Sequence, residues 1–243
     1  MTSQLGFQPW IKRFPGCGDG AIVVFPHAGG AAAAYRTFAS ALAAGGADTY
    51  IVQYPQRAER LRHPAMNSIE ELAAELFDAG EWRAAGPLRL FGHCMGALVA
   101  FEFARLADDR GVPVTHLWSS ASHAPCAVAA SARVPTTDRE LLADMVALGG
   151  TDPRLLADED FLDLLLPSVR ADYRAWNRYS RDADVTITAD IHAIGGEGDH
   201  RVAREPLQQW QCHTSGQFSL ELFAGGHFYL NDHVDTLVAQ VNA

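Results

Sequence analysis

The sequence predicts an α/β fold built on one mostly parallel sheet. Short apolar runs alternate with stretches of helical periodicity over most of the 243 residues, a pattern typical of β-α-β crossovers. Glycine-containing turns follow several of the apolar runs directly, which is where open α/β sheets carry their sites. Hydrophobic residues make up 48% of the chain, so a sizeable core is available, and we expect a single domain over residues 1–243.

The N-terminal half supplies a regular alternation of strands and helices. The run Ala21–Phe25 is rich in β-branched residues, so we expect a buried strand there, ended by Pro26. Ser68–Glu71 has the S-x-x-E pattern of a capping box, which marks the start of a helix. The elements expected in this half are a strand at 21–25, a helix at about 31–44, a strand at 49–53, a helix ending near 78, a strand at 88–91 and a helix at 95–109.

The C-terminal half continues the alternation after an interruption. Strands are expected at 114–119, 186–194 and 218–223, and a closing helix at 232–241. Between the first two of these strands, an insertion from about 124 to 184 contains helical pieces with broad apolar faces, at 141–145, 161–166 and 173–179. We expect this insertion to form a helical lid over the site, and the alternative is an extra packing layer.

A sharp turn joins the strand at 88–91 to the helix that follows it. Residues Gly92–Gly96 read GHCMG and fit the G-x-S-x-G frame of a nucleophile elbow, with Cys94 in place of the usual serine. A strand, a glycine turn and a helix in this order present the central side chain at the top of the sheet. Cys94 is therefore the candidate nucleophile.

A nucleophile of this kind needs a histidine base and an acid that orients it, in the chain order nucleophile, acid, histidine. Asp199 and Glu197 both lie in the glycine turn after the strand expected at 186–194, and both are candidates for the acid. His227 follows the strand at 218–223 and two glycines, so its ring is free to reach Cys94. The oxyanion hole would use the backbone N–H groups of Met95 and, from the loop after the first strand, Ala28.

Composition excludes several other classes of function. A formal net charge of −10 argues against nucleic acid as a partner. We expect no membrane span, because no apolar run reaches about 18 residues, and no secretion signal within residues 1–10. Ten histidines lack paired metal-ligand spacing, so we expect no metal. We expect no disulfide framework or zinc site, because no C-x-x-C spacing relates the four cysteines, Cys17, Cys94, Cys126 and Cys212. The default expectation is a cytoplasmic protein, in which thiols stay reduced.

Taken together, these motifs resemble the type II thioesterases, the discrete α/β-hydrolases that accompany polyketide synthases and nonribosomal peptide synthetases. The resemblance covers nearly the whole chain and implies Asp199 as the acid, the 124–184 insertion as the lid, and no cofactor. It implies hydrolysis of acyl chains held as thioesters on the phosphopantetheine arm of acyl or peptidyl carrier proteins. The matching stretches are FPHAGG at 25–30, QYP at 53–55 with Arg57 and Arg60, GHCMGA at 92–97 except for Cys94, Pro167 with RAD at 170–172, GGEGD at 195–199 with Val202, and GGHFYL at 225–230.

Two residues depart from this family pattern. Gln56 stands where the family usually has glycine, and Cys94 stands where it usually has serine. Cys94 has three interpretations: a native nucleophile, a substitution that traps an acyl-enzyme, or part of an inactive fold that only binds a carrier-bound chain. A native thiol would favour transfer or cyclisation more than a serine would, because its acyl-enzyme is itself a thioester. A dienelactone-hydrolase-like enzyme, which also uses a cysteine elbow, is a further alternative.

Arginines are the candidates for contact with a carrier protein. Arg170, Arg174 and Arg178 recur every four residues and would share one helix face. A second group, Arg57, Arg60 and Arg62, lies in the loop before the capping box. The alternative is a solvated helix face whose arginines pair with local carboxylates such as Asp172. We also expect His27 to contact the substrate or carrier, and we favour a monomer.

Overall fold

A computed structural model describes residue 7 and residues 9–243 of the chain. The expectation that residues 1–10 carry no secretion signal falls mostly on residues 1–6 and 8, which lie outside the described part.

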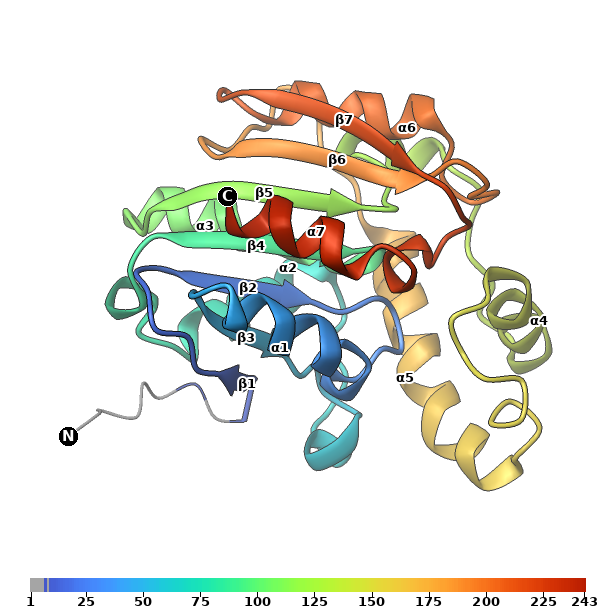
Figure 1. Ribbon diagram of the computed structural model, residues 1–243. Helices are drawn as coiled ribbons and strands as arrows, with labels where there is room; N and C mark the ends of the chain where they lie inside the picture. The colour runs from blue at the N-terminus through green and yellow to red at the C-terminus, as the bar shows by residue number, and fades with distance from the viewer. Residues whose placement is uncertain (1–6, 8) are drawn as a thin grey trace.

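Within the described residues, seven strands form one twisted sheet in the order β1-β3-β2-β4-β5-β6-β7 (Figure 1). All neighbouring strands run parallel except β1, which pairs antiparallel with β3 at one edge. The predicted α/β-hydrolase fold with a mostly parallel sheet is therefore confirmed. The strands are β1 Ile11–Phe14, β2 Ala21–Phe25, β3 Asp48–Val52, β4 Leu88–His93, β5 Val114–Ser120, β6 Asp190–Gly196 and β7 Phe218–Phe223.

Helices cover both faces of the sheet and bury two cores. Helices α1 and α7 pack together over one face, while α2, α3 and α6 cover the other (Figure 1). Strand β2 serves both cores, because Val23 faces one and Val24 the other. The helices are α1 Arg36–Ala44, α2 Ile69–Asp78, α3 Met95–Arg110, α4 Asp138–Leu148, α5 Glu159–Arg178, α6 Arg204–Gln208 and α7 Val234–Asn242.

The strand predicted at 186–194 is wrong in its bounds. Residues 186–189 pair through one isolated bridge, between Ile187 and Thr214, and Thr188 bonds instead to the side chain of Asp108. The ladder with β5 runs from Asp190 to Ile194, and the ladder with β7 continues through Gly196, so both glycines belong to the strand rather than to the turn. The edge strand β1 was not expected from the sequence.

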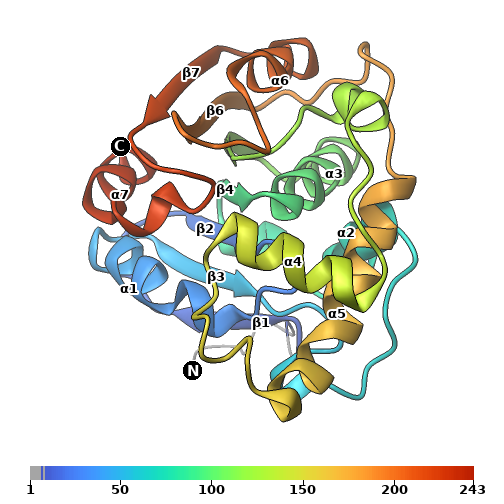
Figure 2. The ribbon, with the colours of Figure 1, turned by 90° about the vertical axis from the view of Figure 1, so that its right-hand side faces the viewer.

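The inserted segment between β5 and β6 lies at the carboxyl ends of the strands, where α4 and α5 cross in front of the sheet (Figure 2). The sequence predicts separate helical pieces at 161–166 and 173–179, and the structure joins both in one helix. Helix α5 runs without a break through Pro167. A proline removes one backbone donor, and this 20-residue helix keeps the rest of its ladder and a broad apolar face.

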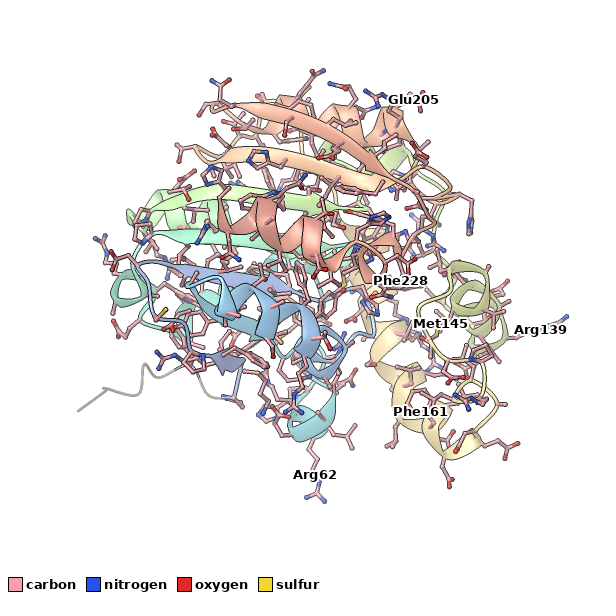
Figure 3. The ribbon with its side chains drawn as sticks, in the orientation of Figure 1. Arg62, Arg139, Met145, Phe161, Glu205 and Phe228 are labelled. Carbon is pink, nitrogen blue, oxygen red and sulfur yellow. The ribbon has the colours of Figure 1, made fainter. Side chains whose placement is uncertain are left out.

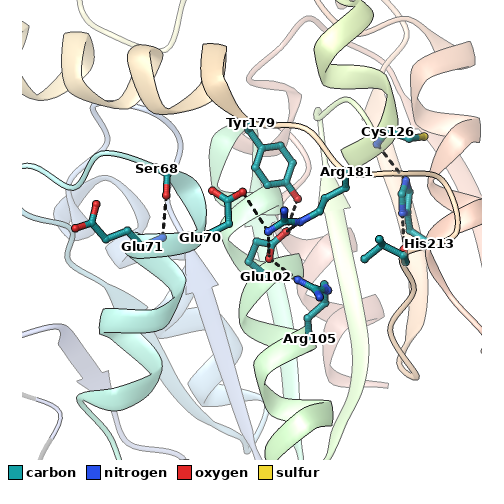
Figure 4. Close-up of polar contacts among 10 residues, drawn as sticks. Ser68, Glu70, Glu71, Glu102, Arg105, Cys126, Tyr179, Arg181 and His213 are labelled. Carbon is teal, nitrogen blue, oxygen red and sulfur yellow. Dashed lines mark hydrogen bonds and ion pairs between the residues drawn. The ribbon is translucent and has the colours of Figure 1, made fainter.

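A buried carboxylate fixes the C-terminal end of the inserted segment to the helices beneath it (Figure 4). Glu102 of α3 accepts hydrogen bonds from Tyr179 Oη at 2.7 Å and from Arg181 Nε at 2.7 Å. Arg105 contacts the same carboxylate at 2.9 Å, and Arg181 also reaches Glu70 of α2 at 3.1 Å. Because its charge is shared among these donors, Glu102 can remain ionised at 3% exposure.

Candidate active site

Cys94 occupies the apex of the turn between β4 and α3. Its backbone has φ 54° and ψ −121°, and its N–H donates to Ser120 O at 2.8 Å. The turn needs glycine two residues later, because a Cβ at Gly96 would lie 2.0 Å from Phe25 O. The strained turn therefore presents the Cys94 thiol above the sheet, at the N-terminus of α3, where negative charge is favoured.

His227 and Asp199 come together although 28 residues separate them. His227 Nδ1 donates to Asp199 Oδ2 at 2.8 Å, because an ionised carboxylate can only accept. The other carboxylate oxygen accepts from the backbone N–H groups of Arg201 at 2.8 Å and Val202 at 3.2 Å. Glu197 is exposed and forms no hydrogen bond with His227. Asp199 is thus the carboxylate that orients the His227 ring.

The pKa of His227 is raised to about 9. Burial alone would lower it, but the charge of the Cys94 sulfur and the hydrogen bond to Asp199 outweigh that effect. Nε2 of His227 is buried and has no hydrogen-bond partner of ordinary geometry among the described residues. Nδ1 is held by Asp199, so Nε2 is the ring atom available to take a proton from Cys94.

We expect the pKa of His227 to fall from about 9 toward 6.5 in a Cys94→Ala variant, because the sulfur is the largest factor that raises it. Because the pKa of His227 is higher in the folded protein than in the unfolded chain, protonation of the ring contributes to the free energy of unfolding. This contribution is complete below about pH 6.5 and is lost as the pH rises through about 9. NMR titration of the His227 ring measures the shift. An unchanged pKa in the alanine variant would show that the two side chains do not interact.

The loop that follows β2 supplies the second expected oxyanion donor. Among the described residues, the N–H groups of Ala28 and Met95 have no side-chain or loop partner, so both remain available to a ligand. The neighbouring Gly29 N–H donates to Asp172 Oδ2 of α5 at 2.7 Å. The inserted helix therefore holds the loop in place.

Asp172 has a partner that the sequence did not suggest. It was considered as a local partner for the exposed arginines of its own helix, and that interpretation is wrong. The Asp172 side chain is 7% exposed and forms an ion pair with Arg57, whose side chain is 5% exposed. Burial raises the pKa of Asp172, while the charge of Arg57 and the Gly29 N–H oppose the rise. Arg57 and Asp172 are 115 residues apart in the sequence, so no local sequence pattern could have indicated this pair.

His27 is a neutral ring that lines the site. Burial, followed by the charges of His227 and Arg57, lowers its pKa to about 3. Tyr35 Oη accepts from the His27 backbone N–H at 3.3 Å and lies 2.8 Å from His27 Nδ1. Because the Tyr35 oxygen already accepts from this backbone N–H, we assign its hydroxyl proton to the bond with Nδ1 and the ring hydrogen to Nε2. Nε2 forms no hydrogen bond to any described residue, so it can donate to a ligand.

Two hollows adjoin these residues. A cavity of about 50 Å³ is lined by Cys94 and His227, and also by Met145 of α4 and Phe228, which are labelled in Figure 3. A larger groove of about 420 Å³ runs between the β2 loop, residues 56–61 and α5, where Phe161 is one of its walls (Figure 3). The two hollows are neighbours, since both are lined by His27, Gly29, Thr151 and Leu165.

The arginines proposed for carrier contact are only partly exposed. Arg174 and Arg178 lie on the outside of α5, and Arg178 donates to Asn67 O at 3.2 Å. Arg170 forms an ion pair with Asp138 of α4. In the second group, Arg57 and Arg60 are buried, at 6% and 3% exposure, and Arg60 stacks on Trp10. The expectation that this second group forms a surface cluster is therefore wrong, and Arg62 alone of its members points outward (Figure 3).

The part of the chain that the structure describes contains neither a membrane-spanning helix nor a cluster of metal ligands. No helix there is both long and apolar enough to cross a membrane. No three histidine, cysteine or acidic side chains in residue 7 and residues 9–243 lie together in a way that could hold a metal ion. His93, the histidine next to Cys94, is fully buried, and its Nδ1 is bonded to Ser120 Oγ at 2.9 Å. This contact fixes the end of β4 to β5 beside the turn at Cys94.

The elbow, the His227–Asp199 pair on two later loops and the parallel sheet define an α/β-hydrolase. The chain belongs to the thioesterase domain family, whose sequence profile matches residues 21–243. This places it among the thioester hydrolases. The family match favours that class over a dienelactone-hydrolase-like enzyme.

Individual relatives occur both as small thioesterases and within a long synthase. Phenyloxazoline synthase MbtB of Mycobacterium tuberculosis is 61% identical over 244 residues, which cover 100% of this chain and 17% of the synthase. Thioesterase PikA5 of Streptomyces venezuelae is 39% identical over 92% of this chain and 80% of its own length. The type II thioesterase BorB from the borrelidin biosynthetic cluster has a TM-score of 0.82 at 36% identity, over 96% of this chain and 98% of BorB.

Proposed function

We propose that this chain releases acyl groups carried as thioesters on the phosphopantetheine arm of acyl or peptidyl carrier proteins. The observation that carries the proposal is Cys94 at the elbow apex, in one small cavity with a His227 ring that Asp199 orients. The similar type II thioesterase YbtT, 29% identical with a TM-score of 0.82 over 96% of each chain, is described as part of the yersiniabactin NRPS/PKS pathway. A place in polyketide or nonribosomal peptide synthesis is therefore part of the proposal.

In the proposed mechanism, His227 Nε2 takes the proton of Cys94, and the thiolate attacks the thioester carbonyl carbon. The backbone N–H groups of Ala28 and Met95 stabilise the oxyanion. The bond between that carbon and the sulfur of the arm then breaks, and His227 returns its proton to the departing thiolate. Water next gives a proton to His227 and attacks the acyl-Cys94 thioester, which releases a carboxylic acid and regenerates Cys94.

Transfer to a nucleophile other than water is a second candidate function, and Cys94 itself favours it. Moving an acyl group from the thiol of the arm to Cys94 exchanges one thioester for another, so the intermediate stays reactive toward an amine or alcohol. A serine at this position would form a less reactive ester. The cysteine therefore makes acyl transfer or cyclisation compatible with the same triad.

The two hollows suggest how a carrier-bound chain would enter. The groove of about 420 Å³ would hold the arm, and the cavity of about 50 Å³ would hold a short acyl unit beside Cys94. His27 lines both hollows, and its neutral Nε2–H would donate to a carbonyl oxygen of the substrate. Helices α4 and α5 would act as the lid that excludes water. Arg174 and Arg178, with Arg170, remain the proposed contacts for the acidic carrier or the phosphate of the arm.

Intact-mass analysis of the protein with a panel of acyl-carrier proteins tests this proposal. We expect a mass increase equal to the acyl group, located on Cys94, followed by its loss as free acid or as a transfer product. Small acyl thioesters without a carrier should load more slowly, because they lack the arm contacts. Loading on another residue, or equal rates with and without a carrier, would contradict the proposed site or the proposed partner.

A further inference from the structure

A second carboxylate of the inserted segment reaches the loop that carries Asp199. Asp144 of α4 forms an ion pair with Arg201, and the Asp144 and Arg201 side chains are only 16% and 17% exposed. The other oxygen of Asp144 accepts from Tyr173 Oη of α5 at 2.7 Å. Asp144 therefore connects both inserted helices to Arg201, across 57 residues of sequence.

Arg201 holds the acid and the inserted helix at the same time. Its backbone N–H donates to Asp199 Oδ1 at 2.8 Å, while its guanidinium donates to Asp144. The N–H groups of Arg201 and Val202 both donate to Oδ1 of Asp199 and fix the orientation of the carboxylate. This orientation places Oδ2 where it bonds to His227. Any rotation of the backbone at Arg201 would therefore change the position of His227 relative to Cys94.

The same three side chains lie close to the proposed chemistry. Tyr173 lines the cavity that contains Cys94. The charge of the Cys94 sulfur also acts on the pKa of Arg201, which is raised because Tyr173, Asp144 and Cys94 together outweigh the effect of burial. Through Tyr173, the network therefore reaches the cavity that contains Cys94 and His227.

We propose that Arg201 is a positioning residue for Asp199, and that Asp144 holds it in place only while α4 lies over the site. The inference rests on the proposed triad of Cys94, Asp199 and His227. Movement of α4 away from the sheet would separate Asp144 from Arg201 and free the backbone that orients Asp199. Closure of the inserted helices and assembly of the triad would then be one event, so that the site is active mainly when it is covered.

An Arg201→Gln variant tests this coupling with a readout that a purely structural role would not move. We expect kcat for a small acyl thioester to fall about tenfold or more, the scale typical of outer positioning contacts, with a smaller change in KM. The pKa of His227, followed by NMR, should fall because its bond to Asp199 is weakened. Loss of a positive charge by itself would raise that pKa, so the sign separates positioning from simple electrostatics.

Four further variants complete the test. Arg201→Lys keeps the charge and should recover much of kcat. Asp144→Asn should lower kcat as Arg201→Gln does, and the double variant should lose little more than either single one, because both remove the same contact. Arg139→Gln removes a positive charge from the exposed side of α4 and should change neither quantity (Figure 3).

A folded Arg201→Gln protein with unchanged kcat, or with a His227 pKa at or above that of the parent, would overturn the proposal. So would full additivity in the Asp144 and Arg201 double variant. If Cys94→Ala, Asp199→Asn and His227→Ala all keep the parent activity, the proposed triad itself is wrong, which is a different result from failure of Arg201 alone.

Discussion

Replacing Cys94 with alanine should abolish covalent loading and lower the rate of thioester release by about 10⁴-fold or more, as removal of a nucleophile does in enzymes with a catalytic triad. The fold should survive, because alanine fits the same turn and the thiol makes no hydrogen bond that the turn needs. Intact-mass measurement and a free-thiol assay follow the two effects. Cys126→Ala is the matched control, since Cys126 is also partly exposed but lies outside the cavity.

Retention of parent activity in Cys94→Ala would show that the site is not used as proposed. A Cys94→Ser variant then separates hydrolysis from transfer. If it releases more free acid and loses transfer to amines or alcohols, the thioester intermediate of the parent is what supports transfer. No activity in either the parent or the serine variant would favour the interpretation that the chain only binds its carrier-bound ligand.

Asp172→Asn should destabilise the folded protein by about 3–5 kcal/mol, the usual cost of removing one partner from a buried ion pair. Arg57 would keep its charge at 5% side-chain exposure with no carboxylate to neutralise it. Urea denaturation at neutral pH measures the change in the free energy of unfolding. The Gly29 amide also depends on Asp172, so activity should fall even under conditions where the variant is fully folded.

Asp138→Asn provides the comparison for this variant. It removes a carboxylate from an ion pair of the same inserted segment, but the Asp138 side chain is 58% exposed. Pairs of that kind contribute about 0–1 kcal/mol, so little change is expected. Equal losses in the two variants would mean that burial does not set the strength of the Arg57–Asp172 pair.

The elements with a strong local signal could be predicted from the sequence. Buried runs such as Ala21–Phe25 and the elbow at Gly92–Gly96 depend on neighbouring residues, so pattern alone locates them. Asp199 and His227 are brought together because parallel strands end at one edge of the sheet, and that rule could be applied before any coordinates. Their catalytic roles, and the role of Cys94, stay predictions.

The parts that were missed depend on contacts between distant segments. Nothing near Arg57 indicates a partner 115 residues away, and nothing near Asp144 indicates Arg201. Pro167 suggests a helix end locally, but the packing of a long apolar face overrides it. Such pairs form because the inserted helices pack against loops that are distant in sequence. Local periodicity cannot predict which segments pack together.

The positive φ of Cys94 limits which nucleophiles this turn can hold. At φ 54° a side chain branched at Cβ is strongly disfavoured, so threonine is excluded, whereas cysteine and serine have the same unbranched shape. The backbone conformation therefore restricts branching at Cβ but does not distinguish oxygen from sulfur at the γ position. An exchange of oxygen for sulfur here leaves the architecture unchanged, and under the proposed mechanism it would alter how long the acyl group stays activated, so that the product could change without a change of fold.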